Sequence, residues 1–437
     1  MAGRGAVSGA AQDAGAAQQS TPPAAASAQD LFGARWQRLM DCVNLKQPDR
    51  MPVGFLPTFW LARYGGISCR ELMYDYDKAR ALTVAACREF QPDIASPSAF
   101  VALGRLLDAT GFQQVNWPGH GVGDHQTFQY IDREYMSADE YDEFLFDPTG
   151  FYLDKYLPRV ASIYQGLRPL GSLVGSCYFD VVNATGMFAA PPMRRTLAQL
   201  TAAGEENERY ARNMAALAEE LAVNGFPLGF GVFAEAPYDF VADYFRGATG
   251  MMKDLYRHRD KLLQVIDKVR ILHVRKVLAA ARMIPNPFVF IPIHWAPDAF
   301  MSQKQFETFW WPSFRRMLLD LIEAELIPLV MWESDCTRRL ETIRDIPPGK
   351  CVYWFERTDM VRAFEVLGDV VALRGNVSPS VMTTGSPQEV DAAVKHLVDN
   401  VWNRGGKLIL DCAFGVPDET PVENVRAMFA AARKYAG

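Results

Sequence analysis

The segment 331–336, MWESDC, places two carboxylates and a thiol within four residues at the end of an apolar run. Side chains alternate along a strand, so Glu333 and Asp335 share one side while the strand continues, and Cys336 follows at the turn. Carboxylate oxygen and thiolate sulfur both suit Zn²⁺, which catalytic sites usually hold with three protein ligands. Cys412 ends another apolar run and offers a second thiolate. These residues are therefore candidate metal ligands.

Other apolar runs also end in residues that can do chemistry. FVFIPIHW (288–295) ends in His294 and Trp295, and VVALRGN (370–376) ends in Asn376. His294 is a candidate metal ligand or general base. Trp295 and Trp332 lie near predicted strand ends and are candidates for lining an apolar pocket.

Each of these residues has a structural interpretation as well. A cysteine at a strand end is often a small buried hydrophobe, and an aspartate ahead of TRRLETI, such as Asp335, is a good helix N-cap. His294 can be a hydrogen-bonded core histidine, and Trp295 and Trp332 can be core residues. The sequence leaves these alternatives open.

The elements that must position these residues alternate along the chain. Helical periodicity is readable at about 32–45, 77–90, 205–224, 253–283, 303–325, 387–403 and 421–435. Apolar runs typical of strands covered on both faces lie at 227–233, 288–295, 327–333, 351–355, 370–376 and 406–412, and 51–55 is a candidate opening strand. This alternation predicts parallel strands joined by right-handed crossovers.

We expect a single α/β domain over 31–437, a (β/α)8 TIM barrel with an insertion at about 110–165; a doubly wound sheet is the alternative. In such a barrel the chemistry lies at the carboxyl ends of the strands. Residues 1–30 are rich in Ala, Gly, Ser, Gln and Pro, which predicts a disordered tail.

Composition excludes several classes of protein. The 437 residues are 49% hydrophobic and carry a net charge of −6 without a basic stripe, which argues against a nucleic-acid partner. No apolar run reaches the roughly 18 residues that a membrane helix needs. The seven cysteines are scattered without a CxxC pair, so we expect neither a disulfide framework nor a zinc ribbon, and a cytoplasmic location. Nucleotide-binding motifs of the GxGxxG and GxxxxGK[ST] types are absent.

The chain resembles the uroporphyrinogen decarboxylase superfamily, and in particular its methyltransferase-like branch. The resemblance is carried by RWQRLMDCVNLKQPDRMPVGF (35–55), EYMSADEYDEFLFDP (134–148), FRGATGMMKDLYRHRDKLL (245–263), FMSQKQFETFWWPSFRRML (300–318), LRGNVSPSVMTTGSPQEV (373–390) and GVPDETPVENVRAMFAAAR (415–433). The fold it implies is a TIM barrel. Decarboxylases of the superfamily bind substrate carboxylates with an RQAGRY stretch, of which only Arg63 and Tyr64 remain in PTFWLARYGG (57–66).

The resemblance also implies a zinc site, because the methyltransferases hold zinc with an HxC pair and a later cysteine. Here Glu333 and Asp335 stand at the HxC positions, so the expected ligands are Glu333, Cys336 and Cys412. The implied reaction is methyl transfer between a small organic substrate and a corrinoid cobalt. The sequence has no DxHxxG motif, so the corrinoid is expected on a separate partner protein.

From these observations we assign acid–base chemistry or substrate orientation to His294 and Asp335, and substrate contacts to Asn376, Trp295 and Trp332. The altered ligand pattern keeps two alternatives open. One is a decarboxylase of a small or tetrapyrrole-like carboxylate, which predicts CO₂ release without a metal. The other is a non-catalytic protein that holds a corrinoid or tetrapyrrole, which predicts a stable coloured complex without turnover.

Overall fold

A parallel sheet forms the centre of the molecule. The computed structural model describes residues 27–97 and 99–437. Strands of the main sheet lie in the order β11–β10–β9–β8–β7–β6, each parallel to its neighbours. They are β6(Val232–Phe233), β7(Phe288–Ile293), β8(Ile327–Trp332), β9(Val352–Phe355), β10(Ala372–Val377) and β11(Leu408–Cys412). All six residues of β7 are buried, as expected for a strand covered on both faces.

A second parallel pair consists of β1(Gly54–Phe55) and β2(Ile94–Ala95). An isolated parallel bridge joins Val53 to Leu410 of β11, and another joins Ala95 to Leu228, just ahead of β6. The predicted α/β class with parallel strands is thus confirmed. Strand β2 has no counterpart in the sequence prediction, because two residues are too few to show a periodicity.

The predicted order of helices between the strands is confirmed. The main helices are α1(Ala28–Val43), α4(Tyr76–Phe90), α10(Pro191–Val223), α13(Arg259–Ala281), α15(Trp311–Glu323), α16(Leu340–Ile343), α17(Met360–Leu367), α19(Pro387–Asn400) and α20(Val422–Ala436). In α13 the buried positions Leu262, Val265, Ile266 and Val269 follow the spacing of one helix face. The helix predicted at 253–283 is divided at His258, because α12(Gly247–Arg257) ends there.

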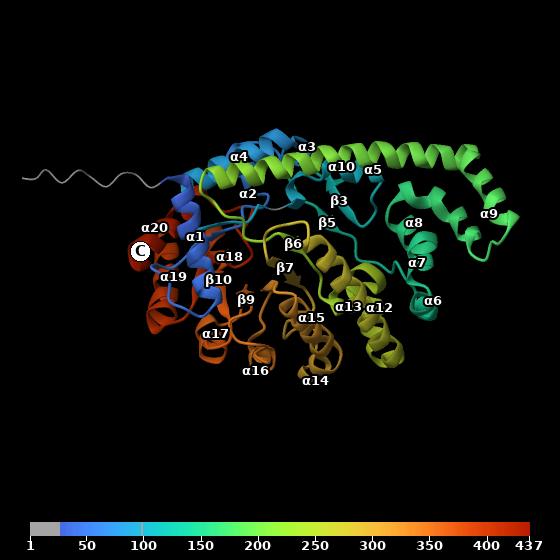
Figure 1. The fold of residues 1–437 in the computed structure, drawn as a ribbon. Coiled ribbons are helices and arrows are strands. Elements are labelled where there is room, and N and C mark those ends of the chain that lie inside the picture. The colour runs from blue at the N-terminus through green and yellow to red at the C-terminus, as the bar shows by residue number, and fades with distance from the viewer. Residues whose placement is uncertain (1–26, 98) are drawn as a thin grey trace, which may run out of the picture.

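Shorter elements fill the connections and the predicted insertion. The helices among them are α2(Trp60–Gly65), α3(Cys69–Tyr74), α5(Gly104–Thr110), α6(Tyr141–Phe146), α7(Pro148–Phe151), α8(Leu157–Val160), α9(Phe179–Asn183), α11(Pro237–Phe240), α14(Gln303–Gln305) and α18(Pro379–Thr384). The strands β3(Val115–Pro118), β4(Gly121–Val122) and β5(Gln129–Tyr130) form a small sheet of their own. Helix α10 begins at Pro191, well before the predicted 205–224, and projects beyond the sheet toward α9 (Figure 1).

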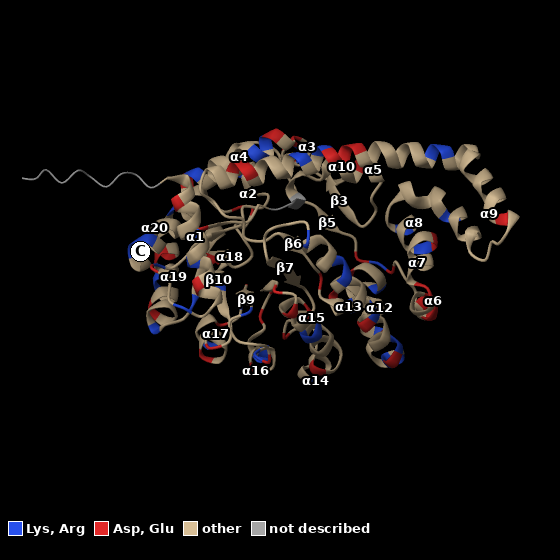
Figure 2. Ribbon diagram, viewed as in Figure 1, with Lys and Arg blue, Asp and Glu red and all other residues tan. Residues whose placement is uncertain are grey.

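Helix α1 corrects the boundary of the predicted tail. It begins at Ala28, and Ser27 and Asp30 form a capping box that satisfies its first backbone N–H groups. The predicted tail is therefore helical from residue 28, and residues 1–26 lie outside the described part. Lys and Arg alternate with Asp and Glu over the outer helices (Figure 2). None of the described helices is long and apolar enough to span a membrane.

Candidate functional site

Four neighbouring strands each end in a titratable side chain. His294, Glu333 and Glu356 directly follow β7, β8 and β9, and Glu235 lies two residues after β6. The carboxyl ends of parallel strands meet at one edge of a sheet, and this edge is where α/β enzymes place their chemistry. One imidazole and three carboxyl groups are therefore gathered at one end of the sheet.

His294 lies between two carboxylates. Its Nδ1 donates to Asp243 Oδ2 over 2.6 Å, and its Nε2 lies 3.5 Å from Glu333 Oε1. The His294 side chain is 33% exposed and that of Glu333 26%, so both remain accessible from outside. An imidazole held by a carboxylate on one nitrogen, with the other nitrogen accessible, has the geometry of a general acid or base.

Asp243 also positions Trp295. Its Oδ1 accepts the indole Nε1–H of Trp295 over 2.6 Å, while Oδ2 holds His294. Asp243 lies in the π-helical segment Val241–Arg246, which follows α11 directly. Segments of this kind recur at functional sites, because the extra residue turns side chains out of the helical register.

Asp239 fixes the backbone beneath this pair. It is fully buried, and its carboxylate accepts the backbone N–H groups of His294 and Trp295 and the indole N–H of Trp310. The bonds from His294 N and from Trp310 Nε1 are each 2.6 Å long. Asp239 thus holds the end of β7 in place, so it is a positioning residue.

Glu235 contributes a buried carboxyl group. Its Oε1 accepts a hydrogen bond from Tyr244 Oη over 2.8 Å, whereas its Oε2 is buried without a hydrogen-bond partner among the described residues. An ionised carboxylate is costly in such a place, whereas a protonated carboxyl group is not. Burial accordingly raises the pKa of Glu235 to about 8.

The electrostatics of the cluster favour a protonated imidazole. Burial opposes the positive charge on His294, but the hydrogen bond to Asp243 and the negative charge of Glu333 outweigh it and raise its pKa to about 10. Burial raises the pKa of Glu333 to about 7 and that of Asp239 to about 6. His294 is therefore placed to donate a proton at neutral pH.

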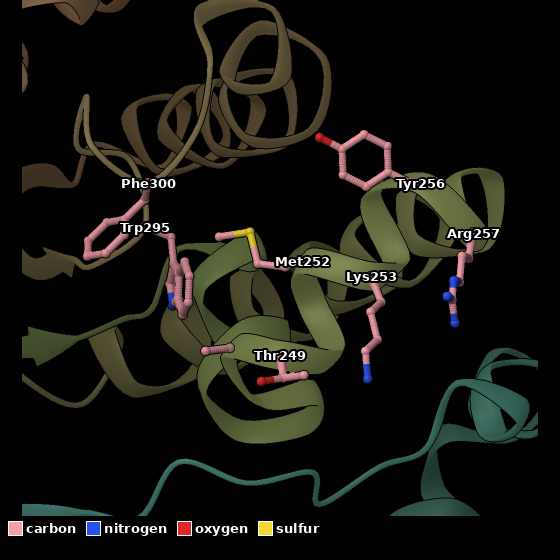
Figure 3. Close-up of a pocket in the computed structure, with 8 residues that line it drawn as sticks. Thr249, Met252, Lys253, Tyr256, Arg257, Trp295 and Phe300 are labelled. Atoms are coloured by element: carbon pink, nitrogen blue, oxygen red, sulfur yellow. The ribbon is translucent and has the colours of Figure 1, made fainter.

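An open cavity of about 670 Å³ adjoins the cluster through Trp295. Its apolar wall consists of Trp295, Phe300 and Met252, with the ring centroids of Trp295 and Phe300 5.4 Å apart (Figure 3). Lys253 and Arg257 of α12 lie toward its other end. Cavities of this size hold small organic ligands. Trp295, predicted to contact substrate, thus lines a cavity and contacts Asp243.

Three other predicted residues are engaged elsewhere. Asp335 is exposed, and its Oδ1 accepts the backbone N–H and the hydroxyl of Thr337, so it closes a local turn. Asn376 donates its amide to the Thr358 carbonyl over 2.9 Å. Trp332 is fully buried and packs in the core against other rings, so it lines no surface at which a substrate could bind.

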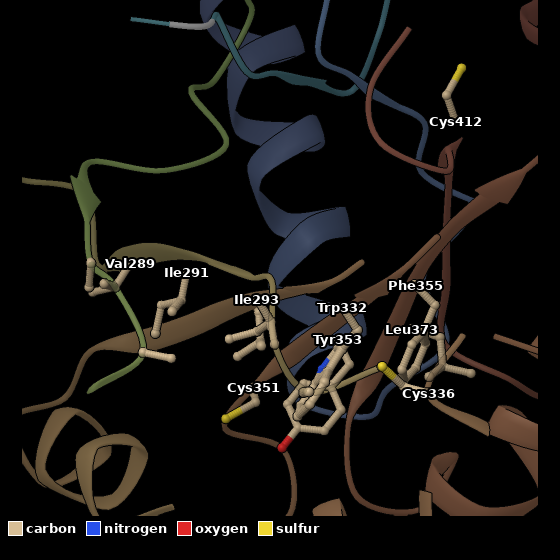
Figure 4. Close-up of a cluster of buried hydrophobic side chains, with 14 of the residues drawn as sticks. Val289, Ile291, Ile293, Trp332, Cys336, Cys351, Tyr353, Phe355, Leu373 and Cys412 are labelled. Carbon is tan, nitrogen blue, oxygen red and sulfur yellow. The ribbon is translucent and has the colours of Figure 1, made fainter. Parts of the chain in front are cut away.

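The three predicted zinc ligands do not come together. Cys336 is fully buried, with its Sγ 3.6 Å from the Glu333 carbonyl, and Cys412 is fully buried with its Sγ 3.6 Å from Met428 Sδ of α20. Figure 4 shows the two thiols in separate parts of the core. Burial raises the pKa of both thiols well above the usual value, as expected for cysteines packed in a core.

This arrangement does not fit the expected zinc ion. Across residues 27–97 and 99–437, no group of three or more His, Cys, Asp and Glu side chains has the spacing of a metal site. The two cysteines behave as small core residues, which is the structural alternative that the sequence left open. No step of the function proposed below is routed through a zinc ion.

Sequence reasoning missed the acids that surround His294. Glu235 and Glu356 follow apolar runs, so the strand-end rule that selected His294 also applies to them. Asp239 and Asp243 are four residues apart in APYDFVADYF, a spacing that puts two carboxylates on one helix face. Only the fold brings that helix against the end of β7.

More than half of the chain matches the model of a known protein family. The sequence model of the family described as "Uroporphyrinogen decarboxylase (URO-D)" matches residues 183–435, more than half of the chain. The uroporphyrinogen decarboxylases of three Coxiella burnetii strains are each 28% identical to it over 110 residues, which is 25% of this chain. The match spans only 29% of the length of these relatives.

A solved structure resembles the fold over nearly its whole length. It is a methyltransferase from Methanosarcina mazei, with a TM-score of 0.58 and 16% sequence identity. The alignment covers 92% of this chain and 98% of the methyltransferase. At this identity the similarity shows a shared fold.

Proposed function

The chain belongs to the uroporphyrinogen decarboxylase family, and we propose that it is an enzyme that transfers a methyl group between a small organic substrate and a corrinoid cobalt. The methyltransferase of similar fold supports this class of reaction. We also propose that the strands close into a (β/α)8 barrel, which the two isolated bridges at β1 and β2 support. The His294 cluster then lies at the mouth of the barrel.

The observation that carries the proposal is the pair of carboxylates around one accessible imidazole. Breaking a bond between a methyl carbon and oxygen leaves an anionic oxygen, which is a poor leaving group unless it receives a proton. His294 holds such a proton on Nε2, and Asp243 fixes the ring by accepting the Nδ1–H of His294. General acid catalysis of this kind contributes about 10²–10⁴-fold to a rate.

The step balances in atoms and electrons. The C–O bond of a methyl ether or methanol breaks, and its electron pair stays on the oxygen, which takes the proton from His294. The methyl group bonds to cobalt(I) of the corrinoid substrate, which supplies both electrons of the new bond and becomes cobalt(III). His294 then regains a proton from solvent. The reverse direction uses the same groups in the opposite order.

The charge of the site disfavours the decarboxylase alternative. A decarboxylase must hold a substrate carboxylate at the reacting centre. In the part of the chain that the structure describes, His294 is the only cation in ionic contact with Asp243 or Glu333. A substrate carboxylate would add a further negative charge to this cluster, and like charges in a partly buried site repel strongly.

Arg63 and Tyr64, which remain from the carboxylate-binding stretch of the decarboxylases, form their contacts away from the His294 cluster. Tyr64 donates its hydroxyl to Glu89 over 2.8 Å, and Arg63 lines a different cavity together with Asp418 and Glu419. That cavity has a volume of about 450 Å³. These contacts favour a substrate that is not a porphyrinogen with many carboxylates.

Methyl transfer to free cobalamin tests the proposal without the unidentified corrinoid partner. Purified protein is mixed with cob(I)alamin and, in separate reactions, methanol or methoxybenzene, and the methylated cobalamin is quantified by absorbance and mass spectrometry. Wild type should methylate cobalamin, and His294→Gln should be at least about 100-fold slower. Lys350→Gln, which lies before β9 at the opposite end of the sheet, is the control.

Two outcomes would overturn the proposal. Release of CO₂ from a supplied carboxylate, without any dependence on cobalamin, would establish the decarboxylase instead. A stable coloured complex with cobalamin that never forms a methyl product in either direction would establish the binding protein.

A further inference from the structure

The cavity beside Trp295 combines an apolar wall with two unpaired cations. Trp295, Phe300 and Met252 form the wall, and Lys253 and Arg257 extend from α12 at the other end (Figure 3). Neither Lys253 nor Arg257 forms an ion pair with any described residue. The cavity thus offers a flat apolar surface and a positively charged end.

The sequence of α12 explains why these side chains face the cavity. The buried Asp254 accepts from Arg246 Nε and from the Tyr141 hydroxyl, both over 2.6 Å, which fixes one face of the helix against the body. Lys253 and Arg257 are four residues apart and therefore lie one above the other on the outward face. The anchored Asp254 thus fixes the face of α12 from which both cations extend.

Two like charges at this spacing destabilise a helix. Arg257 lies in the last turn of α12, where a cation offsets the helix dipole, but Lys253 lies one turn earlier and has no such compensation. A carboxylate between them would neutralise the repulsion, and the guanidinium fork of Arg257 matches a carboxylate in two hydrogen bonds.

The exposed rings at the cavity point to the other half of the ligand. The side chains of Phe300 and Tyr256 are 49% and 79% exposed, and both line the cavity. The Trp295 and Phe300 rings both line the cavity, with their centroids 5.4 Å apart and their planes tilted by 46°. An aromatic ring stacked there gains the contacts that these side chains lack.

We infer that this cavity binds an aromatic carboxylate, with the ring on Trp295 and Phe300 and the carboxylate between Lys253 and Arg257. The inference rests on the proposed function in one respect, that the bound molecule is the substrate. The anionic end lies at α12, and the opposite end of the ring points past Trp295 toward the acid-rich His294 cluster. Trp295 connects the two, because its indole N–H is bonded to Asp243.

Calorimetric titration with three small probes of matched shape tests the inference. The probes are benzoate, neutral benzamide and cationic benzylammonium. Wild type should bind benzoate at least about tenfold more tightly than benzamide, with benzylammonium weakest, and added salt should reduce this preference. The double variant Lys253→Gln/Arg257→Gln should bind benzoate and benzamide equally, whereas Phe300→Ala should weaken all three probes.

Lys350→Gln is again the matched control and should bind as wild type does. The inference is overturned if benzoate binds no more tightly than benzamide, or if the double variant keeps the preference for benzoate. Its failure is distinct from that of the proposed function. If the protein transfers methyl groups but does not prefer benzoate, the proposed function stands and the inferred anion site is rejected. If it prefers benzoate but transfers no methyl group, the anion site stands and the proposed function is rejected.

Discussion

The sheet carries two groups of buried charges, and they differ in whether every charge is paired. At the ends of β6 to β9, one imidazole faces several carboxyl groups, and both His294 and Glu333 are partly exposed. Inside the sheet, Arg374 of β10 and Asp411 of β11 pair over 2.6 Å, with exposed fractions of 1% and 0%. The first group has acid in excess and access to solvent, whereas the second is closed.

The closed pair is completed by its neighbours. Trp354 lies with its ring centroid 3.9 Å from the Arg374 guanidinium carbon, and Asp411 also accepts the backbone N–H of Cys412. A Cβ at Gly54 would lie 2.3 Å from Asp411 Oδ2, so only glycine leaves room for the pair. Charge is buried in both groups, and only the open group combines an excess of acid with access to solvent.

The largest expected effect comes from removing the imidazole of the open cluster. His294→Gln should reduce methyl transfer by about 10²–10⁴-fold, because the proton donor is lost. Its unfolding midpoint in urea at pH 7 should fall, because the stabilising pairing of His294 with Asp243 is lost, but the protein should remain folded. Activity close to wild type in a folded His294→Gln protein would remove His294 from the mechanism.

Breaking the closed pair should affect stability instead of chemistry. Arg374→Met leaves the Asp411 carboxylate buried without its cation, which we expect to lower the free energy of unfolding by about 3–5 kcal/mol. Urea denaturation followed by circular dichroism measures this loss. The double variant Arg374→Met/Asp411→Leu should recover most of it, because no uncompensated charge remains. Equal stability of the single and double variants would contradict this account.

Local features of the fold and of the open cluster could be predicted from the sequence, whereas tertiary contacts could not. Apolar runs and helical periodicity predicted the alternation of strands and helices, because each segment carries its own burial pattern. The strand-end rule selected His294 and Glu333, because each directly follows an apolar run that is visible in the sequence. Asp239 and Asp243 were missed because they lie on a helix whose contact with β7 is a tertiary event.

The cysteines were misjudged for a related reason. Strand position alone does not state on which side of the sheet a side chain lies, and Cys412 points to α20, where it meets Met428. Asp335 had two interpretations from sequence, and its side chain accepts the backbone N–H and the hydroxyl of Thr337 in a local turn, while Cys336 occupies the N-cap position. Trp332 was assigned to a pocket from its place at a strand end, but it faces the core.

Within the open cluster, the carboxylate that orients His294 should matter less than His294 itself. Asp243→Asn keeps the shape but weakens a charge-assisted hydrogen bond, which is valued at about 1.5–3 kcal/mol, or roughly a ten- to hundredfold loss of rate. The same variant should also loosen Trp295. Initial rates of methyl transfer measure the effect, with Asp369→Asn, an exposed partner of Arg344, as the control. A methyl-transfer rate in Asp243→Asn equal to that of Asp369→Asn would argue against the orienting role of Asp243.

The smallest effect is a shift in pH dependence when Glu333 loses its charge. The pKa of His294 is raised to about 10 by Asp243 and Glu333, so wild-type activity should be lost only as pH rises through about 10. Glu333→Gln removes one of the two charges, so this alkaline limb should move to lower pH. The rate at neutral pH should change by less than about tenfold, since His294 stays protonated by its bond to Asp243.

The same charges affect stability in a direction that can be checked independently. Because the folded-state pKa of His294 lies above its usual 6.5, the stabilisation is fully present below pH 6.5 and is lost as pH rises through about 10. Glu333→Gln weakens the cause of that shift, so stability should fall by less in total and should level off at a lower pH than in wild type. Urea midpoints measured from pH 6 to 10.5 test this. Identical pH profiles for the two proteins would mean that Glu333 does not act on His294, and the open cluster would reduce to Asp243 and His294.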